Sequence, residues 1–327
     1  MSGFDTLPRY AVVEIGSNNV RMSIFELRNG ILSEIKIAEK LSFPCNLGQG
    51  ISRDAPDTAI RPDNLEKAGS ALSDFKAISA QYGIPESNIC AFATEALRIV
   101  ERTNQGQQDI ARLSKKFGHP IAILDDKEEA NLVATTMMQA TVPIHQGPAL
   151  CAELGGGSLE IVQINQQGSV TKSETLFLGS HALYLRASGY PSRVADIVNQ
   201  ELGTHFPKQD AKFPETIIIS GGQFTRFGDV MRPDSSPSVM TIDDELFQKA
   251  RKIAVNSPHI IDRPVHFDMA LTTLESMTRH FGSRNVIVAE PEKRQFIAEQ
   301  MARYQQSKSI HPAAQFIMRS LAPALPA

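Results

Sequence analysis

One pattern of strand-type segments and turns occurs twice in the chain, and this repeat constrains the fold more than any other feature. The first copy runs through YAVVEI at 10–15, a small polar turn, VRMSIFEL at 20–27 and a hairpin signal. The second begins with ALCAEL at 149–154, passes a triple-glycine turn and continues with LEIVQI and another hairpin signal. Glu14-Ile-Gly-Ser-Asn-Asn aligns with Glu153-Leu-Gly-Gly-Gly-Ser at an offset of 139 residues (153 minus 14). The sequence therefore predicts two related α/β domains.

Alternating helix and strand signals follow each copy of the repeat, which is typical of a mixed α/β architecture. We expect the first domain to span residues 1–135 and the second to span 136–304, within a chain of 327 residues. A last helical segment at about 305–327 is expected to pack back on the first domain. Helices are predicted at 62–82, 95–101, 107–117, 126–139, 181–187, 192–202, 243–255, 267–281 and 292–304, and further strands at 88–94, 121–124, 216–220 and 285–289.

Charge and cysteine content exclude several classes of function. The formal net charge is −3, so the overall balance favours neither DNA nor an anionic membrane as a partner. The three cysteines are far apart and odd in number, which indicates neither a zinc site nor a disulfide framework. We find no leader-like segment and no apolar run of membrane-spanning length. The sequence therefore predicts a cytoplasmic protein.

The two glycine turns are candidate anion-binding loops. Gly16 permits backbone angles that other residues resist, and Ser17 and Asn18 place short polar groups beside backbone N–H donors. One such turn alone is most simply only a turn, but two copies facing each other would form a two-sided phosphate site. Glu14 and Glu153 end apolar strands, where a carboxylate needs a partner, and a magnesium ion beside a phosphate would supply one.

For the remaining candidates the residues alone leave two interpretations open. Glu129 follows Asp126 by three positions, so it could complete a capping box at the start of a helix, which the local pattern favours over catalysis. Glu160 lies on a strand directly after the triple-glycine turn, and it faces either solvent or the phosphate. Arg21, Arg98 and Arg294 suit phosphate binding, although each taken singly is more simply a surface arginine.

Six motifs in order resemble the exopolyphosphatase/guanosine pentaphosphate phosphatase family (Ppx/GppA) of the actin-like ATPase superfamily. The resemblance covers roughly residues 9–300 and implies two ribonuclease-H-like domains with mixed sheets and an active cleft between them. It also implies an enzyme that hydrolyses a terminal phosphoanhydride by metal-assisted attack of water. The motifs are EIGSNNVRMSIFE, ATEALRIVERTN, ILDDKEEANLV, ELGGGSLE, LFLGSHAL and SGG.

The resemblance assigns a role to each candidate residue. Glu129 falls on the family's catalytic glutamate, which replaces the capping interpretation, and Glu160 falls on a second glutamate that positions metal or water. Arg21 and Arg98 fall on phosphate-binding arginines. The phosphate loops are implied to include Ser17, Asn18, Gly156, Gly157 and Ser158, and the metal, Mg²⁺ or Mn²⁺, is implied to lie at Glu14 and Glu153.

The implied substrate is inorganic polyphosphate, hydrolysed from its end. Two alternatives stay open: a pppGpp 5′-phosphohydrolase, and a weakly active regulatory member that binds (p)ppGpp or polyphosphate. A homodimer is also implied. The first alternative stays open because polyphosphate and pppGpp both offer a terminal phosphoanhydride. The second arises because this chain departs from the family pattern: Glu14 and Glu153 replace aspartates, Leu159 replaces a threonine, His266 replaces an arginine, and the family's Gly-Leu-Arg-Glu-Gly is reduced to the single arginine of EKRQF at 292–296.

Overall fold

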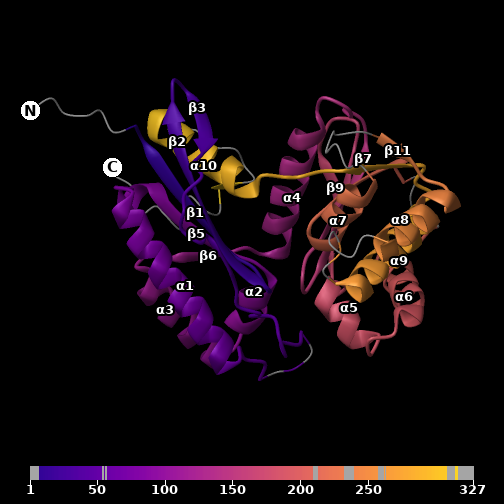
Figure 1. Cartoon of the computed structure of the whole chain (residues 1–327), viewed down its shortest axis with the longest axis horizontal. Coiled ribbons are helices and arrows are strands. Elements are labelled where there is room, and N and C mark those ends of the chain that lie inside the picture. The colour runs from indigo at the N-terminus through magenta and orange to yellow at the C-terminus, as the bar shows by residue number, and fades with distance from the viewer. Residues whose placement is uncertain are drawn as a thin grey trace, which may run out of the picture. The chain divides into compact units, whose positions relative to one another are not determined.

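The computed structural model divides into two compact units (Figure 1). It describes residues 7–53, 55, 57–208, 213–231, 239–256, 261, 263–307, 314 and 315. Unit 1 comprises Met1–Glu129 and Glu292–Ala327, and unit 2 comprises Ala130–Pro291. The boundary expected at 135/136 thus lies in the same helix as the observed one. Residues 292–304 were expected in the second domain, but the structure places them in unit 1, whereas most of 305–327 lies outside the described residues.

Unit 1 is built on a mixed sheet of six strands in the order β3-β2-β1-β5-β6, with β4 paired to β2. Strands β1, β2 and β3 form the antiparallel meander that the sequence predicts, and β5 and β6 join β1 in parallel. Asn29 and Gly30 both have positive φ, 53° and 79°, as a tight hairpin between β2 and β3 requires. The strands are β1 (Arg9–Ile15), β2 (Asn19–Arg28), β3 (Ile31–Glu34), β4 (Ser42–Pro44), β5 (Ile89–Ala93) and β6 (Ile121–Ile123).

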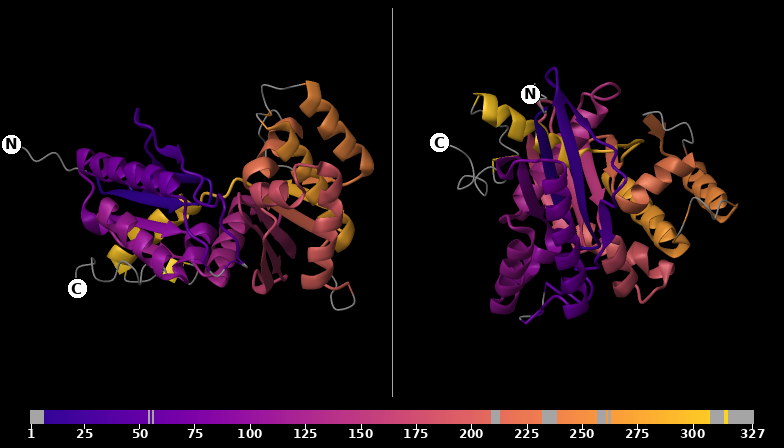
Figure 2. Two further views of the ribbon diagram at one scale, coloured as in Figure 1. Left: turned by 90° about the horizontal axis from the view of Figure 1, so that it is seen from below. Right: turned by 60° about the vertical axis from the view of Figure 1, so that its left-hand side comes forward.

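Helices cover both faces of this sheet. Because side chains alternate along a strand, Ala11, Val13 and Ile15 of β1 share one face, and they pack in one core with α1 (Pro62–Gln81), α2 (Glu95–Glu101) and α3 (Asn104–Phe117). The other face of β1 meets α10 (Lys293–Ser307), the yellow helix in Figure 2. There Tyr10 Oη lies 3.0 Å from Oε1 of Gln305. The last described helix therefore completes the unit that the N-terminus begins.

Unit 2 has a sheet of the same design, in the order β11-β12-β10-β7-β8-β9. Strands β7, β8 and β9 form the second antiparallel meander, and β10 and β12 continue it in parallel from β7. In each sheet the three meander strands lie in the order third, second, first from one edge, and two parallel strands follow the first one. This shared order confirms the predicted fold class. The strands are β7 (Ala149–Leu154), β8 (Leu159–Ile164), β9 (Val170–Leu176), β10 (Thr216–Ser220), β11 (Val239–Thr241) and β12 (Asn285–Val288).

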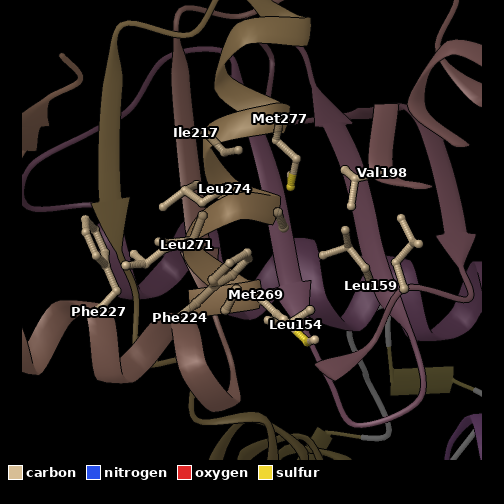
Figure 3. Packing of buried hydrophobic residues seen from close by; sticks show 14 of the residues in the cluster. Leu154, Leu159, Val198, Ile217, Phe224, Phe227, Met269, Leu271, Leu274 and Met277 are labelled. Carbon is tan, nitrogen blue, oxygen red and sulfur yellow. The ribbon is translucent and has the colours of Figure 1, made fainter. Parts of the chain in front are cut away.

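The main core of unit 2 lies on one face of this sheet (Figure 3). Leu154 and Leu159 pack there beside Phe224 and Leu274, each at most 1% exposed. Burying a side chain of this size stabilises the fold by about 1.5–3 kcal/mol. The helices of this core are α5 (Ser180–Arg186), α6 (Val194–His205), α7 (Gly222–Met231), α8 (Asp244–Asn256) and α9 (Pro264–Phe281).

Helix α4 (Asp126–Thr141) lies on the other face of the second sheet. Its residues Val133 and Met137 pack with Ala149 and Cys151 of β7. Since β1 and β7 correspond in the repeat, α4 and α10 occupy corresponding places in the two units. In unit 1, α10 begins beside the end of β1 that carries the glycine turn, since Lys293 contacts Glu14 there.

A few elements were not predicted from the sequence, namely β4, β11, α7 and two short 3-10 helices at Glu86–Asn88 and Pro191–Arg193. The Pro-rich tail at 322–327 lies outside the described residues. Within the described part of the chain, no helix is both long enough and apolar enough to cross a lipid bilayer.

Candidate functional site

The two glycine turns have the same backbone geometry. Gly16 N donates to Asn19 O at 2.9 Å, and Gly155 N donates to Ser158 O at 2.9 Å. The offset of 139 residues takes Gly16 to Gly155 and Asn19 to Ser158, so the two hydrogen bonds join corresponding residues. We refer to residues 16–19 as loop 1 and residues 155–158 as loop 2. The repeat seen in the sequence is therefore also a repeat of structure.

In loop 1 the carbonyl groups are tied to the segment that follows β4. Gly48 N donates to Ser17 O at 2.8 Å, and Cys45 N donates to Asn18 O at 2.8 Å. No described residue accepts a hydrogen bond from the backbone N–H groups of Ser17 or Asn18. With its carbonyls held on one side, the loop can present these two N–H groups to an anion.

Loop 2 is held in the same way by the start of α5. The carbonyl oxygens of Gly155 and Gly156 accept from Ser180 N and His181 N, both at 2.9 Å. Across the described ranges, the N–H groups of Gly156 and Gly157 likewise have no acceptor. Loop 2 is therefore a second candidate anion-binding loop, as the sequence predicts.

Gly179 is the residue that allows α5 to approach loop 2 so closely. A Cβ atom at this position would lie 2.4 Å from the carbonyl carbon of Gly157 and 2.4 Å from Ser158 N, far inside van der Waals contact. Gly179 N donates to Gly157 O at 3.1 Å across this contact. Only glycine at 179 is compatible with the observed position of the loop.

The capping box at the start of α4 is made by Asp125 and Glu128. Glu128 N donates to Asp125 Oδ1 at 2.8 Å, and Asp125 N donates to Glu128 Oε2 at 3.0 Å. The interpretation with Asp126 as the N-cap and Glu129 at N3 is therefore wrong by one residue. Glu129 takes no part in the box, so local helix structure does not account for its carboxylate.

Glu129 lies instead in a network of charged groups at the ends of β5 and β6. It is 5% exposed, and its Oε2 lies 2.6 Å from Nη1 of Arg98. Arg98 also donates to Leu124 O at 2.9 Å and lies 2.9 Å from Asp126 Oδ1. Arg98, predicted to bind phosphate, thus directly orients the predicted catalytic glutamate. A second arginine, Arg53, joins the network through Asp126, at 3.8 Å.

Glu14 is surrounded by cations. Its carboxylate lies 3.3 Å from Lys293 Nζ and 3.8 Å from Arg294 Nη1, both at the start of α10. Arg21 is its register partner on β2. Burial raises the pKa of the Glu14 carboxyl. The positive charges of Lys293, Arg294 and Arg21 together lower this pKa by a larger amount, so it lies below its ordinary value. Glu14 is therefore a carboxylate that holds positive side chains beside loop 1.

Glu153, which corresponds to Glu14 in the repeat, has a different neighbour. Its register partner on β8 is Glu160, which takes the place of Arg21 at the same offset. Directly paired residues of antiparallel strands point to the same face, with Cβ atoms about 4.5–5.5 Å apart. Glu160 is 2% exposed. The second unit thus places two carboxylates side by side next to loop 2.

The surroundings of Glu14 and of the Glu153–Glu160 pair differ in how well they suit a divalent cation. The described ranges contain no group of three or more His, Cys, Asp or Glu side chains that could hold a metal ion. Magnesium typically takes only one or two carboxylates, together with water and substrate phosphate oxygens. The paired carboxylates of Glu153 and Glu160 fit such an ion. Glu14 does not, because Lys293 and Arg294 already neutralise it.

Two further polar groups lie close to loop 2. Nε2 of His181 and Oε1 of Gln223 are buried and have no hydrogen-bond partner among the described residues. His181 belongs to α5, and burial lowers its pKa, as does the charge of Arg263. Gln223 follows Gly221, where an added Cβ would lie 3.1 Å from Cγ of Glu153. Sequence reasoning did not select either residue for the site, since neither belongs to a recognisable spacing of ligands.

The paired sheets and glycine loops define the class of protein, a two-domain α/β protein of the actin-like ATPase fold. Solved structures agree with this fold. A Ppx/GppA family member from Aquifex aeolicus superposes with a TM-score of 0.68 at 18% identity, covering 93% of this chain and 99% of that one. An exopolyphosphatase from Cytophaga hutchinsonii gives a TM-score of 0.71 at 17% identity, covering 91% and 98%.

The sequence itself gives the family. Residues 23–187 match the model of the Ppx/GppA phosphatase family, and the chain belongs to this family. The matched range contains Arg98, Glu129 and loop 2, whereas loop 1 precedes it. A guanosine-5′-triphosphate,3′-diphosphate pyrophosphatase from Vibrio cholerae is 26% identical over 162 residues, which is half of this chain. The match spans only 30% of that relative's length.

Proposed function

We propose that the protein is an exopolyphosphatase that releases the terminal phosphate of inorganic polyphosphate by attack of water. The observation that carries the proposal is the state of Glu129, a nearly buried carboxylate that has no capping duty and is held by Arg98 at 2.6 Å. Family membership supports the same reaction class. Water activation needs a carboxylate in a fixed orientation, and Glu129 is such a group.

Each glycine loop, considered within its own unit, would bind phosphate oxygens of the substrate. Backbone N–H groups of loops 1 and 2 are preorganised donors for phosphate oxygens, since their carbonyls are tied elsewhere. Arg21 adds a guanidinium beside loop 1. Glu129 would then orient a water molecule toward the terminal phosphorus and accept its proton, and the shortened phosphate chain would leave.

We further propose that Glu153 and Glu160 hold Mg²⁺ or Mn²⁺. When bound, the ion would offset the charge of the phosphate groups. The support is the pairing of two carboxylates on one face of the sheet next to loop 2.

The alternative substrate is pppGpp, which has the same terminal phosphoanhydride. The relative from Vibrio cholerae, whose name specifies such a guanosine substrate, supports this alternative. The other alternative is a weakly active member that binds (p)ppGpp or polyphosphate for regulation. Its support is the set of departures from the family pattern at Glu14, Glu153, Leu159 and His266.

Phosphate release from long-chain polyphosphate and from pppGpp, with and without Mg²⁺ and Mn²⁺, tests the proposal. The variant is Glu129→Gln, which keeps the size of the side chain and removes its basicity. The matched control is Glu128→Gln, because glutamine also serves in a capping box. We expect Glu129→Gln to lower kcat by about 10²–10⁴-fold, in the range for a general base, with Glu128→Gln close to wild type.

Each substrate outcome has a distinct meaning. Faster turnover of polyphosphate supports the proposal, and faster turnover of pppGpp favours the alternative enzyme. Binding of ppGpp without turnover of either compound favours the regulatory protein. Full activity in Glu129→Gln would remove that residue from its role.

A further inference from the structure

We propose that Arg53 is a positioning residue, which holds the carboxylate of Glu129 in a fixed place relative to loop 1 within unit 1. The inference rests on the proposed function, in which loop 1 binds phosphate and Glu129 orients the attacking water. It is built on contacts made by residues 45–53, which we call the 45–53 segment. Arg53 is the last residue of this segment.

The 45–53 segment is fastened to loop 1 by its backbone. Gly48 N donates to Ser17 O at 2.8 Å, and Cys45 N donates to Asn18 O at 2.8 Å. A Cβ atom added at Gly48 would lie only 3.0 Å from Cβ of Ser17, so the two backbones are in close contact. A displacement of the segment would therefore be transmitted to loop 1.

The other end of the segment is also held. Arg102 Nη2 donates to Ser52 O at 3.2 Å and to Arg53 O as well. Ser52 N in turn donates to Thr58 Oγ1 at 3.0 Å. Ile51, two residues before Arg53, is 7% exposed and belongs to the core of unit 1. The backbone of Arg53 is thus anchored, and its side chain extends from a defined position.

The guanidinium of Arg53 meets two carboxylates. Its Nε and Nη2 lie 3.1 and 2.8 Å from Oε1 of Glu95, and Nη2 lies 3.8 Å from Oδ1 of Asp126. The same Oδ1 atom lies 2.9 Å from Nη2 of Arg98, whose Nη1 holds Glu129 at 2.6 Å. Asp126 therefore lies between the two arginines. A continuous path of contacts runs from the 45–53 segment to the proposed water-orienting carboxylate.

The ion pair with Glu95 fixes the helix that carries Arg98. Glu95 is the first residue of α2, and Arg98 follows three positions later, so the two side chains are neighbours on the helix surface. Arg53 thus holds the first turn of the helix from which Arg98 reaches Glu129. The guanidinium acts on Glu129 by two routes, through α2 and through Asp126.

Stability alone does not account for the pair of Arg53 and Glu95. The side chain of Glu95 is 2% exposed, and that of Arg53 is 29% exposed. Removing charges from water costs free energy, and a buried ion pair often stabilises a fold no more than apolar side chains of similar volume. An acid at the start of α2 suits the helix dipole without an arginine. What the pair adds is a fixed distance between loop 1 and the Arg98 network.

Steady-state hydrolysis of polyphosphate by Arg53→Met tests the inference, or of pppGpp if that is the faster substrate. We expect kcat to fall about tenfold to a hundredfold, since a displacement of about 1 Å can cost a hundredfold in rate. KM should change by less than about twofold, because loop 1 itself is intact. Arg53→Lys keeps the charge and should retain most of kcat. Arg112→Met, which breaks the exposed pair with Glu66, is the matched control and should behave like wild type.

The Glu129→Gln background gives the second readout. There Arg53→Met should change the residual rate by less than about twofold, because a residue that acts through Glu129 has little effect once that carboxylate is gone. An arginine with a purely structural role would slow both backgrounds by the same factor.

Thermal melting of each variant shows whether it folds. If Arg53→Met does not fold, Asp126→Asn decides the matter, since the Asp126 side chain is 56% exposed and its loss leaves the buried Glu95 paired. Asp126→Asn breaks the direct route between the two arginines and should lower kcat by about tenfold.

The results that overturn the inference differ from those that overturn the proposed function. Wild-type kcat in Arg53→Met would end the inference, as would equal losses in the wild-type and Glu129→Gln backgrounds, or wild-type kcat in Asp126→Asn where Arg53→Met does not fold. The proposed hydrolysis stands in all these cases. Failure of the wild type to hydrolyse either polyphosphate or pppGpp with any divalent ion would end both.

Discussion

Arg98 Nη1 lies 2.6 Å from Oε2 of Glu129 and donates as well to the carbonyl oxygen of Leu124. One guanidinium thus joins helix α2, the end of β6 and the first turn of α4. The carboxylate and guanidinium side chains are 7% and 14% exposed, so water screens the pair weakly. The orientation of Glu129 is therefore a property of the unit 1 fold and precedes any substrate.

Removal of Arg98 should destabilise the protein strongly. Arg98→Met leaves the Glu129 carboxylate buried without its guanidinium, and we expect a loss of about 3 kcal/mol in the free energy of unfolding, the lower end for a broken buried pair. Urea unfolding at pH 7 measures it. Arg112→Met is the control, since Arg112 pairs with Glu66 at the surface, both 58% exposed, and should change stability little. Equal losses in the two variants would contradict the importance of burial.

Gly179→Ala should disturb loop 2. The new Cβ would lie 2.4 Å from backbone atoms of Gly157 and Ser158, so the loop must move, at a cost of about 1–3 kcal/mol and with weaker phosphate binding. Gly203→Ala in α6 is the matched control, because nothing lies within 4 Å of its Cβ position. That change should stabilise the protein by about 0.4–1 kcal/mol. Calorimetric unfolding and tripolyphosphate binding of both variants check the contrast.

Substitutions at two helix N-caps should distinguish a loss of stability from a loss of activity. Asp125→Ala removes the capping box of α4, and Thr103→Ala removes the cap of α3, where Thr103 Oγ1 accepts from Gly106 N at 2.9 Å. Each should cost about 1 kcal/mol in unfolding free energy. Only Asp125→Ala should also lower kcat, because α4 carries Glu129 one turn later. A fall in kcat of the same size in Thr103→Ala would show that general destabilisation causes it.

The pH dependence of stability should report the ion pairs of Glu14 with Lys293 and Arg294. Burial raises the pKa of Glu14, but its three cationic neighbours lower it more, so the folded pKa lies below the unfolded value of about 4.3. The carboxylate therefore stabilises the protein at neutral pH, and this contribution is lost as the pH falls through the folded pKa.

Glu14→Gln should accordingly be less stable than wild type at pH 7, with a difference that shrinks below about pH 5. Urea unfolding between pH 3 and pH 8 measures this difference. In the Lys293→Met background the effect of Glu14→Gln should be smaller, since the main partner is gone. A difference that widens on acidification would contradict the ion pairs.

The sequence predicted the parts of the structure that depend on local pattern. The meander at 149–164 has the observed strand bounds, Ala149–Leu154 and Leu159–Ile164, because alternation of apolar residues and flanking glycines define them. The offset of 139 residues predicted that the two turns would share one geometry, as the equal bonds of Gly16 and Gly155 confirm.

The remaining features of the site depend on backbone geometry and on long-range contacts, which the local sequence pattern does not determine. Asp125 and Asp126 are adjacent acids, and by sequence either could cap α4. In the structure the backbone geometry makes Asp125 the N-cap, and Glu129 therefore takes no part in capping. Two of the partners of Glu14, Lys293 and Arg294, are almost the whole chain away, at the start of α10. A basic pair at a helix start was the available signal, since it opposes the preference of the helix dipole.

The contact between Tyr10 and Gln305, 295 positions apart, has a consequence for biosynthesis. A ribosome delivers β1 before unit 2 and α10 after it, so the strand that carries Glu14 emerges long before the helix that covers it. Unit 2 is one continuous segment, Ala130–Pro291, and its chain is complete while unit 1 still awaits its closing helix. Unit 1 is thus begun before unit 2 and completed after it, and the ion pairs of Glu14 with Lys293 and Arg294 form only once the chain of unit 2 has been made.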